Sequence, residues 1–435
     1  MSLAGGRNWR TVAVLLALSL AVIPLGLALG NIRVDYTLVT VAAGGAVLGI
    51  VCGVLGSFAV LRQQSLLGDA LSHAALPGVA LAFLLAGREL GWLLLGAGIA
   101  SWLGVLLINS LVRRTRLKQD AAMGVVLTAF FALGITLLTY IQSRNDASQA
   151  GLDQFIFGQA AAIRRQDVVL ISAVGLAAFL VLIALWKEFK LITFDPAFAQ
   201  ANGFPLRLLD VTLSTLIVVA IVLGLQLAGV VLMVGLLIAP AVAARQWTRQ
   251  LDQMLVLAGI FGGFAGAGGA IFSGLQQGLP TGPLIIVVAV AIVALSITLA
   301  PERGLLWRAW RQRRDRQRFA EQQVLQDIHR HATQHRDPRY PAPGGMLVAL
   351  RGPLARPALR QLQREGLLQS GADDDWTLSE RGLERAQEAA RNQLLWERYR
   401  QFGEELGLPS VTVDTQQPID RLLPADALAR LETLD

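Results

Sequence analysis

The sequence of 435 residues is poor in cysteine, in histidine and in charge. Its single cysteine, Cys52, lies inside an apolar run, so an intrachain disulfide and a cysteine-based metal site are excluded. Charged residues make up 16% of the chain, against about 25% in soluble proteins. The patterns G-x-x-x-x-G-K-[ST], G-x-S-x-G and H-E-x-x-H are missing as well. The chain therefore has no P-loop of its own with which to hydrolyse ATP.

Apolar residues dominate instead, at 54% of the chain with a mean hydropathy of +0.52. They gather in about ten runs, each close to the ~20 residues that cross a hydrocarbon core. This pattern predicts an all-α polytopic membrane protein, with residues 1–300 as its transmembrane domain. The first run is interpreted as a retained span, because no small-residue cleavage site follows it. The runs are 11–30, 37–61, 66–86, 91–112, 121–141, 167–186, 207–227, 229–245, 252–274 and 280–300.

Lysine and arginine in the connecting loops indicate how the spans are oriented. With the N-terminus inside, twelve basic residues fall in cytoplasmic segments and five in external ones, so both termini are expected in the cytoplasm. The cytoplasmic set is Arg7, Arg10, Arg62, Arg113, Arg114, Arg116, Lys118, Lys187, Lys190, Arg207, Arg245 and Arg249. The external set is Arg33, Arg88, Arg144, Arg164 and Arg165. The Arg164–Arg165 pair opposes this bias, and either lies at an external surface or indicates a miscounted span.

Two ionisable residues lie in the apolar run 66–86. Asp69 and His73 are four residues apart, so on a helix they share one face and can converge on one ion at mid-membrane. Pro77 follows after four more residues and lacks the N–H that would bond the His73 carbonyl, which permits a kink. Carboxylate, imidazole and carbonyl suit Mn²⁺ or Zn²⁺. The alternative is that Asp69 and His73 only hold neighbouring helices together.

The loop between runs 167–186 and 207–227 contains a complete set of signals for a short helix. Asp195 can cap its start, Pro196 suits its first position and Gly203 suits its end. With Phe194, Phe198 and Ala199 also in this loop, it resembles a docking element. An ordinary interfacial loop is the alternative.

Glycine and proline mark several of the other spans. Gly45, Gly49 and Gly53 form one ridge of small residues, and Gly259 and Gly263 begin another. Such ridges let helices pack closely in lipid, so they predict architecture and not chemistry. Pro240 in run 229–245 frees a carbonyl and permits a bend.

Beyond residue 300 the composition changes to that of a basic helix, 301–320, followed by a soluble domain, 321–435. Helices are expected near 319–332, 354–366 and 379–405, with a turn at Ser370–Asp375. Helices followed by a hairpin predict a small, cytoplasmic, winged-helix-like α+β domain. Arg356, Arg360 and Arg364 form a stripe that could contact phosphates, although a solvated charged face is commoner. His329, His331 and His335 lack acidic or cysteine companions and are interpreted as solvated.

The run SLLGDALSHAALPGVALAFLL, preceded by GSFAVLRQQ, closely resembles the signature of the metal-transporting ABC permease family, which imports manganese, zinc or iron. FDPAFAQANGF resembles its cytoplasmic coupling helix, and GVVLMVGLLIAPAVAA its later core helix. The resemblance covers roughly residues 37–300. It implies a fold like that of the type II ABC importers, in the bacterial cytoplasmic (inner) membrane.

The same resemblance implies partners and roles. A permease of this family pairs with a second permease subunit, docks two cytoplasmic ATPases and receives metal from an extracytoplasmic solute-binding protein. It is a transport subunit and not an enzyme, and it holds no permanent cofactor. By this resemblance Asp69 and His73 match the metal ligands, and the coupling helix comprises Phe194, Asp195, Pro196, Phe198, Ala199 and Gly203.

The tail is similar to the C-terminal extension of longer family members, which resembles metal-dependent repressors of the diphtheria-toxin-repressor type. LSERGLERAQEAARNQLLWERY and DRLLPADALARLETLD carry this likeness. Gln393 stands where a His is usual, and the region of Gln416, Gln417 and Asp420 lacks the usual Glu and His ligands. The tail is therefore interpreted as a contact or assembly domain. Its likeness to manganese-type regulators places manganese ahead of zinc as the cargo.

Two other functions remain as alternatives. In a proton-coupled secondary transporter, Asp69 and His73 would be a proton relay. In a membrane-tethered regulator, the tail would bind DNA. Neither is favoured, since the docking loop argues against the first and the net charge of +7 is largely explained by membrane topology. Nucleic acid is not expected as a partner.

Overall fold

The computed structural model describes residues 36–87, 89–143, 164–275, 279–301, 303–371, 374–409 and 418–433. The chain divides into two compact units between Trp307 and Arg308, which we call the helical unit and the C-terminal unit. The expected span 11–30 and the residues Gln416 and Gln417 lie outside the described ranges.

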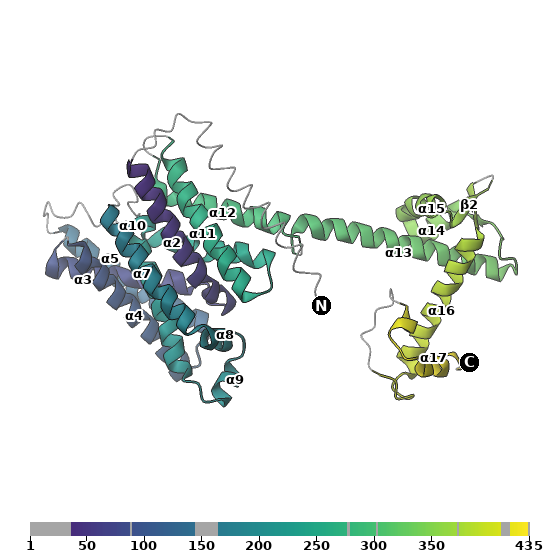
Figure 1. The fold of residues 1–435 in the computed structure, drawn as a ribbon, viewed down its shortest axis with the longest axis horizontal. Helices are drawn as coiled ribbons and strands as arrows, with labels where there is room; N and C mark the ends of the chain where they lie inside the picture. Colours follow the sequence, from purple (N-terminus) through teal and green to yellow (C-terminus); the bar gives the residue numbers. More distant parts are fainter. Residues whose placement is uncertain are drawn as a thin grey trace. The chain divides into compact units, whose positions relative to one another are not determined.

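The helical unit is a bundle of long apolar helices, seen in the purple-to-green half of Figure 1. Within the described residues, eight helical segments are long and apolar enough to cross a membrane. This confirms the predicted all-α membrane fold. The elements of the unit are α2 (Tyr36–Leu61), α3 (Leu67–Ala86), α4 (Leu90–Arg114), α5 (Gln119–Ser143), α7 (Arg165–Ala184), α8 (Trp186–Phe194), α9 (Pro196–Ala201), α10 (Leu206–Trp247), α11 (Leu251–Ser273) and α12 (Thr281–Leu299).

Helix α10 contains both of the spans expected at 207–227 and 229–245. The two halves meet at Gly229, whose φ of 75° and ψ of 169° are not helical. A Cβ on Gly224 would overlap the sulfur of Met233, although nine residues of straight helix would separate the two by roughly 13 Å. The chain therefore bends sharply at Gly229. In the second half the apolar helix is the shorter Met233–Trp247, which overlaps most of the expected run 229–245.

Helices α2 and α11 approach each other backbone to backbone. A Cβ added to Gly49 would overlap the carbonyl oxygen of Gly262, and one added to Gly262 would overlap that of Gly49. Gly45 and Gly266 form a second reciprocal pair. The ridge of Gly45, Gly49 and Gly53 is thus confirmed as a packing surface.

The predicted ridge on α11 also packs on α2. Gly259 and Gly263 face the side chains of Val54 and Ile50, while Gly262 and Gly266 make the backbone contacts. The sequence did not indicate which of these glycines would meet the α2 backbone, because that depends on how the whole bundle rotates α11.

The C-terminal unit is built on α13 (Leu305–Gln334), which begins just before it. Its other elements are β1 (Ala342–Pro343), α14 (Gly344–Arg351), the 3-10 turn η3 (Gly352–Leu354), α15 (Ala355–Arg364), β2 (Leu368–Ser370), β3 (Asp375–Leu378), α16 (Glu380–Phe402), η5 (Ile419–Arg421) and α17 (Ala425–Glu432). The strands form an antiparallel sheet in the order β1-β3-β2. Helices followed by a β-hairpin match the predicted winged-helix-like order.

Two features of the C-terminal unit differ from expectation. The helix expected near 319–332 is the second half of α13, so the expected boundary at residue 320 lies inside a continuous helix. Helix α14 was not expected, because its eight residues are too few to show a helical period. Arg351 ends α14 and donates two hydrogen bonds to Asp327 of α13, at 2.6 and 2.9 Å. The hydrogen-bonded Asp327 carboxylate raises the pKa of the Arg351 guanidinium.

The glycine contact predicts a specific response to substitution. Gly49→Leu places a side chain against the Gly262 carbonyl, so we expect a strong loss of folded protein in detergent, measured by size-exclusion chromatography and thermal melting. Overpacking of this kind costs about 1–3 kcal/mol or more. Gly124→Leu in α5 is the matched control, because a Cβ there meets nothing within 4 Å. Equal melting of the two variants would contradict the backbone contact.

Candidate functional site

Asp69 and His73 lie side by side on α3, as their spacing predicts. The Nε2 atom of His73 is 3.3 Å from the Oδ1 atom of Asp69. Their side chains are 18% exposed for His73 and 35% exposed for Asp69. The pair is therefore partly enclosed but still reachable by a small ion.

The His73 ring is held by an aromatic contact from a neighbouring helix. Its edge-on partner is Phe131 of α5, with ring centroids 4.9 Å apart and planes at 81°. The Nδ1 atom of His73 is buried and has no hydrogen-bond partner among the described residues. Buried polar atoms are nearly always paired in folded proteins. The ring therefore faces Asp69 with its Nε2 edge and not with its Nδ1 edge.

Gly134 lets α5 come close to α3 just beyond this pair. A Cβ on Gly134 of α5 would lie 2.6 Å from the Cβ of Leu76 and 3.1 Å from the Cδ of Pro77.

Pro77 lies inside α3 and has no N–H, so it cannot bond the His73 carbonyl. The His73 carbonyl oxygen is thus a third possible donor, beside the Asp69 carboxylate and the His73 ring.

The pair lies closer to one end of α3 than the mid-membrane expectation assumed. The helix has 20 residues, or about 30 Å, and Asp69 belongs to its first turn. The free N–H groups of a helix start attract negative charge. The Asp69 carboxylate is therefore stabilised by α3 itself, and the pair sits where the helix begins.

Two side chains are too few to hold a divalent transition metal alone, since such ions take four or more ligands. In the described ranges, no group of three or more His, Cys, Asp and Glu side chains comes together. Carbonyl groups, water or a second subunit would have to complete the shell.

The predicted capped helix is present as α9. The Asp195 Oδ1 atom accepts a hydrogen bond from the Phe198 backbone N–H at 2.9 Å, and Pro196 occupies the first position. Gly203 has a φ of 77°, the left-handed conformation that ends a helix. These three predictions are confirmed, because all of the signals act within one or two turns of chain.

Two aromatic side chains stand out from this segment. Phe194 is 58% exposed and Phe198 is 55% exposed, while Ala199 of α9 is fully buried. Asn202 donates a hydrogen bond to the Phe198 carbonyl at 2.8 Å and so fixes the last turn. We call Phe194 and Phe198 the aromatic knob.

Ion pairs connect the neighbourhood of the knob to other helices, and sequence reasoning missed both. Asp210, near the start of α10, pairs with Arg62 at 2.5 Å, just before α3 begins. Lys190 of α8 lies 4.0 Å from Asp252 of α11. The partners are far apart in the chain, and the only signal was a charge at the end of each apolar run.

A family comparison decides what kind of protein carries this site. The profile of the ABC 3 transport family matches residues 34–300, which is more than half of the chain. The chain belongs to the ABC 3 transport family. It is accordingly a membrane protein, and a family of this kind works with ATPase and substrate-binding partners.

Two relatives are similar in sequence to this chain over most of their own length. The manganese transport system membrane protein MntC of Bacillus subtilis is 42% identical over 404 residues, covering 91% of this chain and 90% of the relative. The zinc transport system membrane protein TroC of Treponema pallidum is 47% identical over 281 residues, covering 64% and 94%. The similarity to MntC is longer than the whole helical unit, so it continues into the C-terminal unit.

A solved structure supports the fold of the family region. PsaBC from Streptococcus pneumoniae, solved in complex with a Fab, matches with a TM-score of 0.56 and 31% identity. The match covers 65% of this chain and 97% of that chain.

The geometry of the pair predicts a binding measurement. Asp69→Ala and His73→Ala should each weaken Mn²⁺ and Zn²⁺ binding to the purified protein by about tenfold or more, because each removes one of two side-chain ligands. Titration calorimetry or metal analysis after dialysis provides the measurement. Asp120→Ala, which removes an exposed carboxylate from the first turn of α5, is the matched control. Unchanged binding in both site variants would exclude the pair as ligands.

Proposed function

We propose that this chain is the membrane-spanning permease subunit of an ATP-binding cassette importer of divalent transition metal ions, with manganese as the first candidate and zinc as the second. The observation that carries the proposal is the Asp69–His73 contact on a membrane helix of a chain in this family. The names of two relatives, a manganese and a zinc transport protein, support the class of cargo.

The chemistry of the pair suits a cation that must lose water to pass. Asp69 offers a hard oxygen and neutral His73 offers a nitrogen, a combination suited to ions of borderline hardness. One carboxylate and one imidazole discriminate poorly between such ions, because affinity follows the Irving–Williams order. Manganese is placed first because of the tail's likeness to manganese-type regulators and the MntC relative.

ATP hydrolysis takes place on a separate subunit, in keeping with the family and with the missing P-loop. The aromatic knob of Phe194 and Phe198 is the proposed contact with that ATPase. Exposed aromatic anchors that insert into a partner's pocket are the usual source of binding energy at interfaces. The Asp195 cap keeps the knob ordered before it docks, which lowers the entropy lost on binding.

Movement of the aromatic knob would reach the Asp69–His73 pair through the ion pair between Arg62 and Asp210. Asp210 lies near the start of α10, which follows α9 after a short loop, and its partner Arg62 precedes α3 by a few residues. A rigid-body shift of α9 and the start of α10 would therefore pull on the start of α3, where Asp69 sits. Pro77 and Pro240 are proposed as points where the moving helices bend.

The proposed assembly contains two permease subunits, two cytoplasmic ATPases and an extracytoplasmic solute-binding protein that delivers the metal. Its location is the bacterial cytoplasmic membrane, with both termini of this chain inside. The basic residues that precede α3, end α4 and follow α7 support this orientation.

Uptake measurements test the cargo pathway. In cells that depend on this importer, Asp69→Ala and His73→Ala should each lower manganese uptake by about tenfold or more, since an ion without ligands faces the full dehydration cost. The complex should remain assembled when purified by a tag on the ATPase. Asp120→Ala should transport normally. Wild-type uptake in both site variants would remove the pair from the pathway.

ATPase coupling tests the knob. Phe198→Ala and Phe194→Ala should reduce co-purification of the ATPase or its transport-stimulated hydrolysis, because truncation of an anchor residue typically costs about 2 kcal/mol. Leu85→Ala is the control, since Leu85 is also exposed, at 88%, but lies in the last turn of α3, at the opposite end from Asp69. If coupling survives in both Phe variants, α9 is not the docking element.

A further inference from the structure

The first turns of α13 combine exposed apolar residues with a dense positive charge. Helix α12 ends at Leu299 and α13 begins at Leu305, with a tight turn in which the Gly304 N–H bonds the Ala300 carbonyl at 2.7 Å. Six residues span at most about 20 Å. Residues 305–318, which we call the basic segment, therefore begin close to the surface of the membrane that α12 crosses.

The start of the basic segment is unusually apolar for an exposed helix. Leu305, Leu306, Trp307 and Trp310 are 55%, 59%, 46% and 53% exposed. Leu306, Trp307 and Trp310 share one helix face by their spacing of three and four residues. Tryptophan is enriched where membrane meets water, because its ring is apolar and its N–H is polar. These side chains thus fit the boundary between headgroups and acyl chains.

The rest of the basic segment is cationic. All of its arginines are exposed, and Asp315 is the one acidic residue among them. The guanidinium of Arg314 lies 5.5 Å from the Trp310 ring centre, which joins the charged part to the aromatic part. The arginines are Arg308, Arg311, Arg313, Arg314, Arg316 and Arg318. Such a cluster next to a membrane span complements anionic lipid headgroups.

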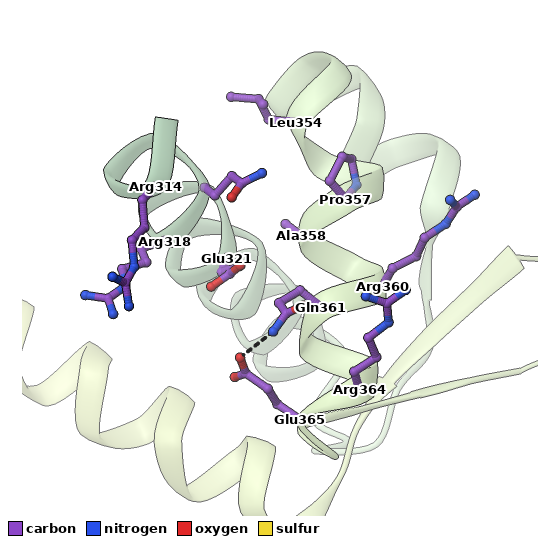
Figure 2. Close-up of a pocket in the computed structure, with 11 residues that line it drawn as sticks. Arg314, Arg318, Glu321, Leu354, Pro357, Ala358, Arg360, Gln361, Arg364 and Glu365 are labelled. Carbon is purple, nitrogen blue, oxygen red and sulfur yellow. Dashed lines mark hydrogen bonds between the residues drawn. The ribbon is translucent and has the colours of Figure 1, made fainter. Parts of the chain in front are cut away.

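A cleft beside the basic segment shows whether its arginines gather around a single point. It measures about 550 Å³ and lies between α13 and α15 (Figure 2). Arg314 and Arg318 are on one side and Arg360 and Arg364 on the other, with Glu321, Gln361 and Glu365 between them. Burial, and then the nearby Glu365, raise the pKa of Glu321. The side chains of Arg314 and Arg318 point away from α15, so the four arginines do not converge on one point in this cleft (Figure 2).

We propose that the basic segment lies on the cytoplasmic leaflet and binds anionic phospholipid. Its leucines and tryptophans enter the boundary between headgroups and acyl chains, and its arginines pair with phosphate groups. The exposed apolar start favours a lipid surface over nucleic acid, whose binding needs cationic residues but no exposed leucines. The inference rests on the membrane location and not on the cargo, so transport and lipid binding can fail separately.

Spin-label accessibility in the full-length protein tests this inference. A nitroxide is placed at Leu306→Cys in a Cys52→Ala background, in nanodiscs of phosphatidylcholine alone or of a two-to-one mixture with phosphatidylglycerol. We expect the label to be more accessible to oxygen and less accessible to a water-soluble nickel chelate when phosphatidylglycerol is present. A label at Leu350→Cys in α14, an exposed position of the C-terminal unit, should remain accessible to nickel in both discs.

Charge variants separate lipid binding from the alternatives. A triple variant of the basic segment carries Arg308→Gln, Arg313→Gln and Arg316→Gln. It should reduce the effect of phosphatidylglycerol on the accessibility of the Leu306 label by about tenfold. The matched triple variant on α15, with Arg356→Gln, Arg360→Gln and Arg364→Gln, should leave this effect unchanged. The proposal is overturned if the Leu306 label is equally exposed to nickel in both discs, or if both triple variants behave alike. It is also overturned if the basic-segment variant loses tight binding of duplex DNA while lipid contact stays as in the unmodified chain.

Discussion

The close contact of α2 with α11 is the constraint on which the helical unit depends. In lipid, helices gain little from burying apolar side chains against each other, so close packing must supply the attraction. At Gly49 and Gly262 the two backbones come within reach of each other because neither residue has a Cβ. Helix α2 also packs on α10, and α10 on α3, so this contact sets the frame in which the Asp69–His73 pair is held.

The features that could be predicted from the sequence are those fixed within a few residues of chain. The contact of Asp69 with His73 follows from a spacing of one helical turn, and the cap at Asp195 follows from signals three residues apart. The membrane fold follows from apolar runs of sufficient length. Each of these outcomes needs only the local geometry of a helix.

The features that could not be predicted depend on contacts between distant parts of the chain. Arg62 and Asp210 meet across 148 positions, and Phe131 reaches the His73 ring from another helix. Whether Gly262 or Gly263 meets the backbone of α2 depends on the rotation of α11 in the bundle. Periodicity defines which residues share a face, but it does not define which neighbour that face will meet.

The break at Gly229 separates α10 into two helices. The first half carries Asp210 and follows α9 in the chain. The second half packs through Leu237 and Pro240 on the glycines of α2. A continuous helix would pass any tilt at one end directly to the other. The positive φ of Gly229 instead lets the two halves meet at a sharp angle, and residues of both halves pack against α2. The two halves of α10 are therefore separate helices, and their angle at Gly229 can change without breaking the hydrogen bonds inside either half.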